Sequence, residues 1–142
     1  MTRRIILIEI GGSLEEMVTM NHRLRSLTVT LDGGGSVITT GVKADVRIPY
    51  TGVITGWEIV ADVTGSIVID VWKDTYGAFP PVVGDSIAGS EKPTLASQLT
   101  NSDDTLTTWG TAVTAGDWVR INVDSVSAVH RVTLAIQITA SN

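Results

Sequence analysis

The stretch Gly56–Pro81, GWEIVADVTGSIVIDVWKDTYGAFPP, decides the fold class of this chain. In its first half apolar residues alternate with polar ones, which predicts a half-buried β-strand. Thr64–Ser66 has the composition of a turn, and the alternation resumes after it, so a second strand is expected. The stretch ends in an aromatic loop that closes on two prolines. It therefore predicts an all-β protein with a prominent loop after the second strand.

The segments on either side of this stretch continue the same pattern. The long segment from Lys73 to Asp104 is rich in Pro, Gly, Ser and Asp and is expected to be irregular. No long helix is indicated that could cover a parallel sheet, so an antiparallel β-sandwich or jelly roll is expected. Further strands are predicted at 24–31, 42–48, 118–124 and 132–138, with a short one within 105–114 that places Leu106 and Trp109 in the core.

The length and composition indicate one domain preceded by an extended arm. The chain has 142 residues and no cysteine, which excludes a disulfide framework and thiolate chemistry. We divide it into an N-terminal arm, residues 1–25, and a β domain, residues 26–142. In the arm, Arg4–Ile10 is apolar on both faces, which is typical of a strand that is covered on both sides. Residues 13–20 fit a short helix or a second strand.

The charge is distributed unevenly between these two parts. The arm holds four arginines and three glutamates, a net +1, whereas the remainder holds six basic and twelve acidic residues, a net −6. An acidic body argues against nucleic acid as a partner. The apolar run after Arg4 is too short for a signal peptide or a membrane span, so neither secretion nor a membrane is expected.

The titratable residues form no catalytic pattern. His22 and His130 lie far apart in the sequence, and no motif supplies a nucleophile or acid for them. Asp70 and Asp74 flank the aromatic loop, but the alternation of the strand places Asp70 on a solvent face. We expect no catalytic residue, no metal and no cofactor. The weak calcium candidates are Asp32, Asn101, Asp103 and Asp104.

The aromatic loop is the candidate contact site for a ligand or partner. Its candidate residues are Trp72, Asp74, Tyr76 and Phe79. Exposed rings at these positions would suit stacking on a sugar or burial in a protein interface. The alternative is that the loop folds back and its rings close one end of the sandwich.

Several blocks of the body resemble a recurrent β domain in structural proteins of tailed bacteriophages. The resemblance spans about Gly33 to Thr139, and the arm lies outside it. The blocks that carry it, in order, are GVKADVRIP (41–49), TGW (55–57), GSIVIDVWKDTYGAFPP (65–81), DSIAGSEKP (85–93), TAGDWVRINVD (114–124) and RVTL (131–134).

This resemblance implies a non-enzymatic structural protein, made in the host cytoplasm and exposed on the virion. The first expectation is a capsid decoration protein, docked on the capsid through its arm and assembled as a homotrimer. The expected partner is another virion protein, either the major capsid protein or a tail protein. The alternative is a tail-fibre or receptor-binding tip that recognises a host glycan. It comes second because such a fibre usually needs a shaft, and none is evident in the sequence. A free carbohydrate-binding module is a second alternative. The candidate docking residues of the arm are Arg3, Arg4, Ile6, Ile8 and Ile10.

Overall fold

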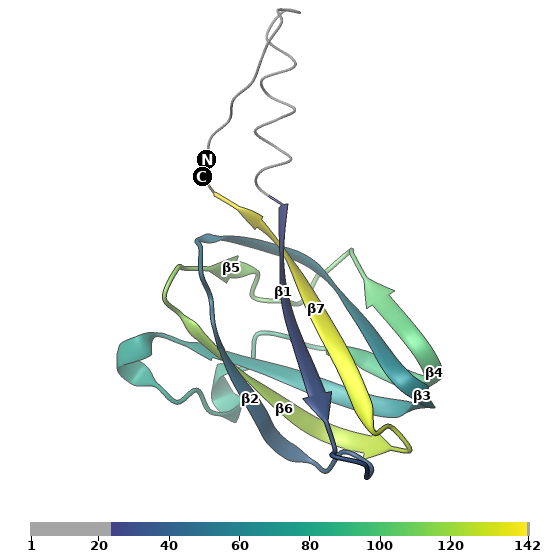
Figure 1. The fold of residues 1–142 in the computed structure, drawn as a ribbon. Coiled ribbons are helices and arrows are strands. Elements are labelled where there is room, and N and C mark those ends of the chain that lie inside the picture. The colour runs from purple at the N-terminus through teal and green to yellow at the C-terminus, as the bar shows by residue number, and fades with distance from the viewer. Residues whose placement is uncertain (1–23, 142) are drawn as a thin grey trace, which may run out of the picture.

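A computed structural model describes residues 24–141 as one curled antiparallel sheet of seven strands (Figure 1). The described residues contain no α-helix, only two short 3-10 helices, η1 (Tyr76–Ala78) and η2 (Val83–Asp85). The fold is therefore all-β, as the sequence predicts. The strands are β1 (Leu24–Asp32), β2 (Gly41–Arg47), β3 (Gly52–Asp74), β4 (Thr94–Asp103), β5 (Ala112–Val113), β6 (Trp118–Ser127) and β7 (Arg131–Ala140).

The arm falls almost entirely outside the described residues. The strand expected at Arg4–Ile10, the choice between helix and strand at 13–20, and the five candidate docking residues all lie there. The last two residues of the predicted arm, Leu24 and Arg25, already belong to β1.

The central strand of the sheet is β3, which has 23 residues and changes partner along its length. The strand order is β1-β7-β3-β6-β2, and both β4 and β5 also pair with β3. The first part of β3 pairs with β7 and the last part with β6. One strand thus passes through both halves of the curled sheet, and the apolar core lies inside the curl.

The predicted turn at Thr64–Ser66 is wrong, because β3 continues through it. The register with β4 shifts between Val60 and Ile67, so the strand bends instead of reversing. A Cβ at Gly65 would lie 2.7 Å from the backbone oxygen of Ser127. Glycine is needed here for this close approach of two backbones and not for a tight turn.

The sequence also fails to predict β4, which lies inside the segment expected to be irregular. Its residues, TLASQLTNSD, are mostly polar, and of its side chains Leu95 is the apolar one that is buried. An edge strand with a hydroxyl-rich outer face shows little apolar alternation, so its backbone pairing with β3 is not visible in the sequence.

The core confirms the alternation that the sequence shows in β6 and β7. In β6, Val119, Ile121 and Val123 are each about 1% exposed. Trp109 is buried and Leu106 packs against the core, as expected for the segment before β5. The inward residues of β7 are all buried: Val132, Leu134, Ile136, Ile138 and Ala140.

Candidate functional site

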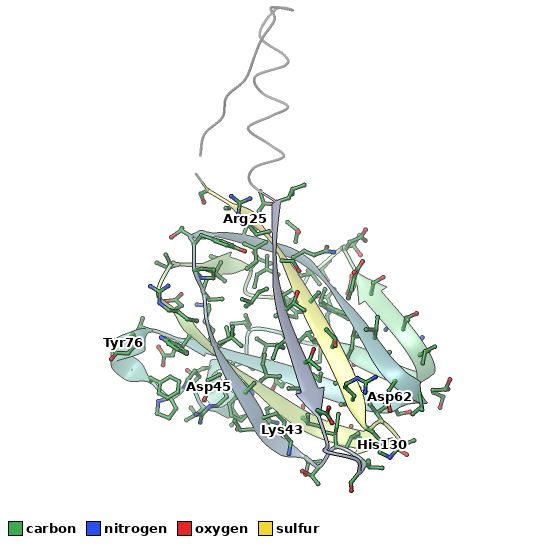
Figure 2. All side chains as sticks on the ribbon, viewed as in Figure 1. Arg25, Lys43, Asp45, Asp62, Tyr76 and His130 are labelled. Atoms are coloured by element: carbon green, nitrogen blue, oxygen red, sulfur yellow. The ribbon has the colours of Figure 1, made fainter. Side chains whose placement is uncertain are left out.

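The aromatic loop between β3 and Ser86 projects from the body and is held by its own hydrogen bonds. Figure 2 shows Tyr76 at its far end, away from the sheet. The Thr75 hydroxyl accepts from the Ala78 N–H at 3.3 Å and caps η1, while the Asp85 carboxylate accepts from the Val82 N–H at 2.8 Å. These local bonds fix the backbone, so the loop presents its side chains from a defined shape.

The end of this loop exposes apolar side chains, which we call the tip surface. Tyr76 is 75% exposed and Val83 is 67% exposed. Exposed apolar side chains that cluster on one projecting loop are typical of a binding surface. The tip surface consists of Tyr76, Phe79, Val82 and Val83.

Phe79 links the tip surface to the sheet. Its ring lies edge-to-face on Trp118, with centroids 5.9 Å apart, and the Arg120 guanidinium sits 5.2 Å from its centroid. Arg120 is held in turn by two hydrogen bonds to the Asp45 carboxylate, at 2.8 and 3.1 Å. This carboxylate raises the pKa of Arg120. The loop is therefore braced from β2 and β6, with the face of one ring under a fixed cation.

The other two candidate residues support the loop from inside. The Trp72 indole N–H donates to the Asp70 carboxylate at 3.0 Å, and the Asp74 carboxylate accepts from the Thr75 N–H at 2.8 Å. Both side chains are partly buried. The structure thus places Tyr76 and Phe79 on the tip surface, and Trp72 and Asp74 at its base.

Sequence reasoning missed the aliphatic part of the tip surface. Val82 and Val83 directly follow Pro80 and Pro81 and have no strand pattern to place them in the core. Two β-branched residues after a double proline, inside a loop, were the available signal.

The expectation that Asp70 lies on a solvent face is wrong, because its side chain is only 2% exposed. Ile67, Ile69 and Val71 keep the inward alternation of β3, so Asp70 lies on the opposite face of the strand. It is buried there because Ser86 and Lys92 contact its carboxylate. The carboxylate accepts from the Val71 N–H and the Ser86 hydroxyl on one oxygen, and from the Trp72 indole on the other. A buried carboxylate is thereby satisfied by hydrogen bonds.

Lys92 joins this carboxylate to a second one. Its ammonium lies 3.4 Å from Asp70 and 2.7 Å from Asp124. The hydrogen bond that Lys92 donates to the Asp124 carboxylate is the main cause of a raised pKa at Lys92. A lysine that is kept protonated cannot accept the proton of the Ser86 hydroxyl, which donates to Asp70 instead. Ser86 and Lys92 thus both contact the Asp70 carboxylate.

The Glu91 carboxylate binds the segment before β5 through hydrogen bonds. It accepts the backbone N–H groups of Thr107 and Thr108 and both of their hydroxyls. The hydroxyl of Thr108 is the main cause of a lowered pKa at Glu91. The backbone oxygen of Glu91 accepts from the indole N–H groups of Trp57 and Trp109. These bonds tie the loop after β4 to the core.

His130, the histidine within the described residues, has Asp62 as its partner. His130 lies in the turn before β7, where Asp62 accepts the backbone N–H groups of His130 and Arg131. The Arg131 N–H is the main cause of a lowered pKa at Asp62. Among residues 24–141 no cluster of three or more His, Cys, Asp or Glu side chains could hold a metal ion. No helix in the same range is long and apolar enough to cross a membrane.

These lowered pKa values predict acid sensitivity. Glu91 and Asp62 bind protons less readily when folded, so their contribution to stability is complete above their ordinary pKa values and is lost as the pH falls through the folded values. We expect the free energy of unfolding to fall below about pH 4. Urea titrations between pH 7 and pH 3 measure this. In Glu91→Gln the free energy of unfolding should fall less steeply with decreasing pH. An unchanged pH dependence in that variant would contradict the role assigned to Glu91.

Comparisons with known proteins give no family for this chain. No protein-family model matches it, and no curated protein matches it. A chain in the crystal structure of the Aeromonas sobria serine protease (ASP) and the chaperone (ORF2) complex matches 89% of this chain with 9% identity and a TM-score of 0.35. The structure of infectious bursal disease virus Gx strain matches 84% with 16% identity and a TM-score of 0.26. The chain spans 30% and 37% of those two chains, respectively.

Proposed function

We propose that this protein is a non-enzymatic structural component of a tailed-phage virion, exposed on the particle as a capsid decoration protein. The tip surface is the observation that carries the proposal. It gives the chain an apolar contact surface on a hydrogen-bonded loop, with Tyr76 and Val83 largely exposed to solvent. Rigid aromatic and aliphatic side chains bind protein partners at a low cost in conformational entropy. The polar clusters at Asp70 and Glu91 are occupied in holding the fold.

The arm is the second element of the proposal. Arg4–Ile10 is apolar on both faces, and an unpaired strand of this kind promotes aggregation unless another chain covers it. We propose that it anchors the body by pairing with a sheet edge of a neighbouring subunit, in a homotrimer on the particle. The resemblance of the body to phage structural domains supports the same class of protein.

A glycan-binding tip is the second candidate function, and the exposed ring of Phe79 favours it. That ring lies beside Arg120, which Asp45 holds by two hydrogen bonds, so the exposed part of the ring is near fixed polar groups. This combination is suited to stacking and hydrogen bonding with a sugar. In that case the protein would act as a receptor-binding tip or as a free carbohydrate-binding module.

The location and copy number of the protein in purified particles test the proposal. We expect hundreds of copies on the head, measured by quantitative mass spectrometry and by labelling with an antibody. A few copies at the tail, together with binding to host glycans on an array, would instead establish the receptor-binding function. Absence from purified particles would contradict both virion functions.

A further inference from the structure

The core is incompletely covered along one line, between β1 and β2. These strands lie at the two ends of the sheet order, and within residues 24–141 their ladder partners are β7 and β6. They follow one another in the chain and contact each other across the open side of the curl (Figure 1), yet no ladder joins them. Two strand edges with unpaired backbone groups therefore face each other.

The inward side chains in the middle of these two strands are only partly buried, whereas Leu31, near the end of β1, is buried. Leu27 and Val29 of β1, and Ala44 and Val46 of β2, pack against the core but remain accessible to solvent. We call these four residues and the two edges beside them the β1–β2 groove. By contrast, Leu134 of β7 is fully buried. Solvent thus reaches these four side chains at the edge of the core.

The groove has defined ends and a defined length. Figure 2 shows Arg25 and Lys43 at its opposite ends. At one end the Arg25 guanidinium lies 5.6 Å from the centroid of the Tyr50 ring. At the other end is a cavity of about 310 Å³, lined by Leu31, Ile38 and Lys43 among others. A nine-residue strand such as β1 is about 30 Å long.

We propose that residues Arg4–Ile10 of a second copy of this chain pair as a strand in the β1–β2 groove. This inference rests on the proposed anchoring role of the arm and names its partner. Seven residues in a strand span about 23 Å, which fits within the groove. Because side chains alternate along a strand, Ile6, Ile8 and Ile10 share one face and would cover the groove residues. The unpaired edges supply the backbone hydrogen bonds.

The length of the chain before β1 allows a neighbouring copy to be reached. Residues 11–23 separate Ile10 from the start of β1, and an extended segment of that length spans up to about 45 Å. Each copy has one such arm and one groove, so a closed ring satisfies every arm and every groove.

Disulfide cross-linking tests this inference directly, because the chain contains no cysteine. Two full-length variants, Ile8→Cys and Ala44→Cys, would be co-expressed with tags of different mass and mildly oxidised. We expect a mixed disulfide dimer, and the same result at Ile6 or Ile10 if the register is shifted. Leu99→Cys, on the exposed part of β4, is the matched control for Ala44→Cys and should give no mixed dimer with Ile8→Cys.

A double variant, Ile8→Cys/Ala44→Cys, separates the possible occupants. A disulfide that forms only within one chain would overturn the inference, because the arm would then fill its own groove. No cross-link at any of the three arm positions would also overturn it. Neither result would change the location of the protein on particles, so the failure of this inference is distinguishable from the failure of the proposed function.

The oligomeric state in solution provides a second measurement on the full-length chain. Ile6→Asp/Ile8→Asp puts two carboxylates on the face that meets the groove, and the mass measured by light scattering should fall from that of an oligomer to that of a monomer. Thr19→Asp/Asn21→Asp adds the same charge elsewhere in the arm and should leave the mass unchanged. A wild-type protein that is already a monomer at high concentration would contradict the inference.

Discussion

Asp70→Ala should lower the free energy of unfolding by about 3 kcal/mol. Removing one partner of a buried ion pair typically costs about 3–5 kcal/mol, because the groups that remain lose their partners. Here the Ser86 hydroxyl, the Trp72 indole and the Lys92 ammonium would all lose an acceptor. Lys92 is 34% exposed, so water partly compensates, and the lower end of that range applies. Urea unfolding with an unchanged m-value measures the loss.

Asp124→Ala is the matched control, because it removes the other carboxylate from the same lysine. Asp124 is 29% exposed and Lys92 keeps Asp70 in this variant, so we expect a loss below about 1 kcal/mol. The raised pKa of Lys92 also predicts how its contribution to stability depends on pH. Its contribution to stability is present below the ordinary lysine pKa and is lost as the pH rises through the folded value. Equal losses of unfolding free energy in Asp70→Ala and Asp124→Ala would show that the burial of Asp70 does not determine its contribution to stability.

The sequence predicts the parts of this fold in which local alternation and burial agree. In β7, Val132, Leu134 and Ile136 alternate with small or polar residues, and the strand lies in the sheet as predicted. The prediction fails where a contact between distant segments changes the local pattern. At Gly65 the close approach of the Ser127 backbone turns an expected hairpin into a bend.

The same reason limits prediction of the polar clusters and of the candidate site. Asp70 lies on the outer face of β3 but is buried because Ser86 and Lys92, 16 and 22 positions further along the chain, cover it. No window of sequence contains that information. The aromatic loop, in contrast, could be selected from its composition. Which of its side chains face solvent depends on Trp118 and Arg120, which hold Phe79 from a distant strand.

Tyr76→Ala/Val83→Ala should weaken binding of the protein to its particle by about 30-fold while leaving its stability nearly unchanged. Aromatic residues at the centre of an interface typically contribute about 2 kcal/mol or more, and each 1.4 kcal/mol is about tenfold in affinity. Both side chains lie largely in solvent in the free protein, so their truncation should change the free energy of unfolding by less than about 0.5 kcal/mol. Sedimentation of the protein with particles that lack it measures the affinity.

Leu99→Ala is the control for loss of an exposed apolar side chain. Leu99 is 46% exposed and lies on β4, on the opposite side of the body from the projecting loop (Figure 1). Its truncation should leave binding unchanged. Phe79→Ala should differ from both, because its ring also contacts Trp118 and Arg120, and it should lose about 1 kcal/mol of stability as well as affinity. Full binding by Tyr76→Ala/Val83→Ala would remove the tip surface from the interface and contradict the observation on which the proposed function rests.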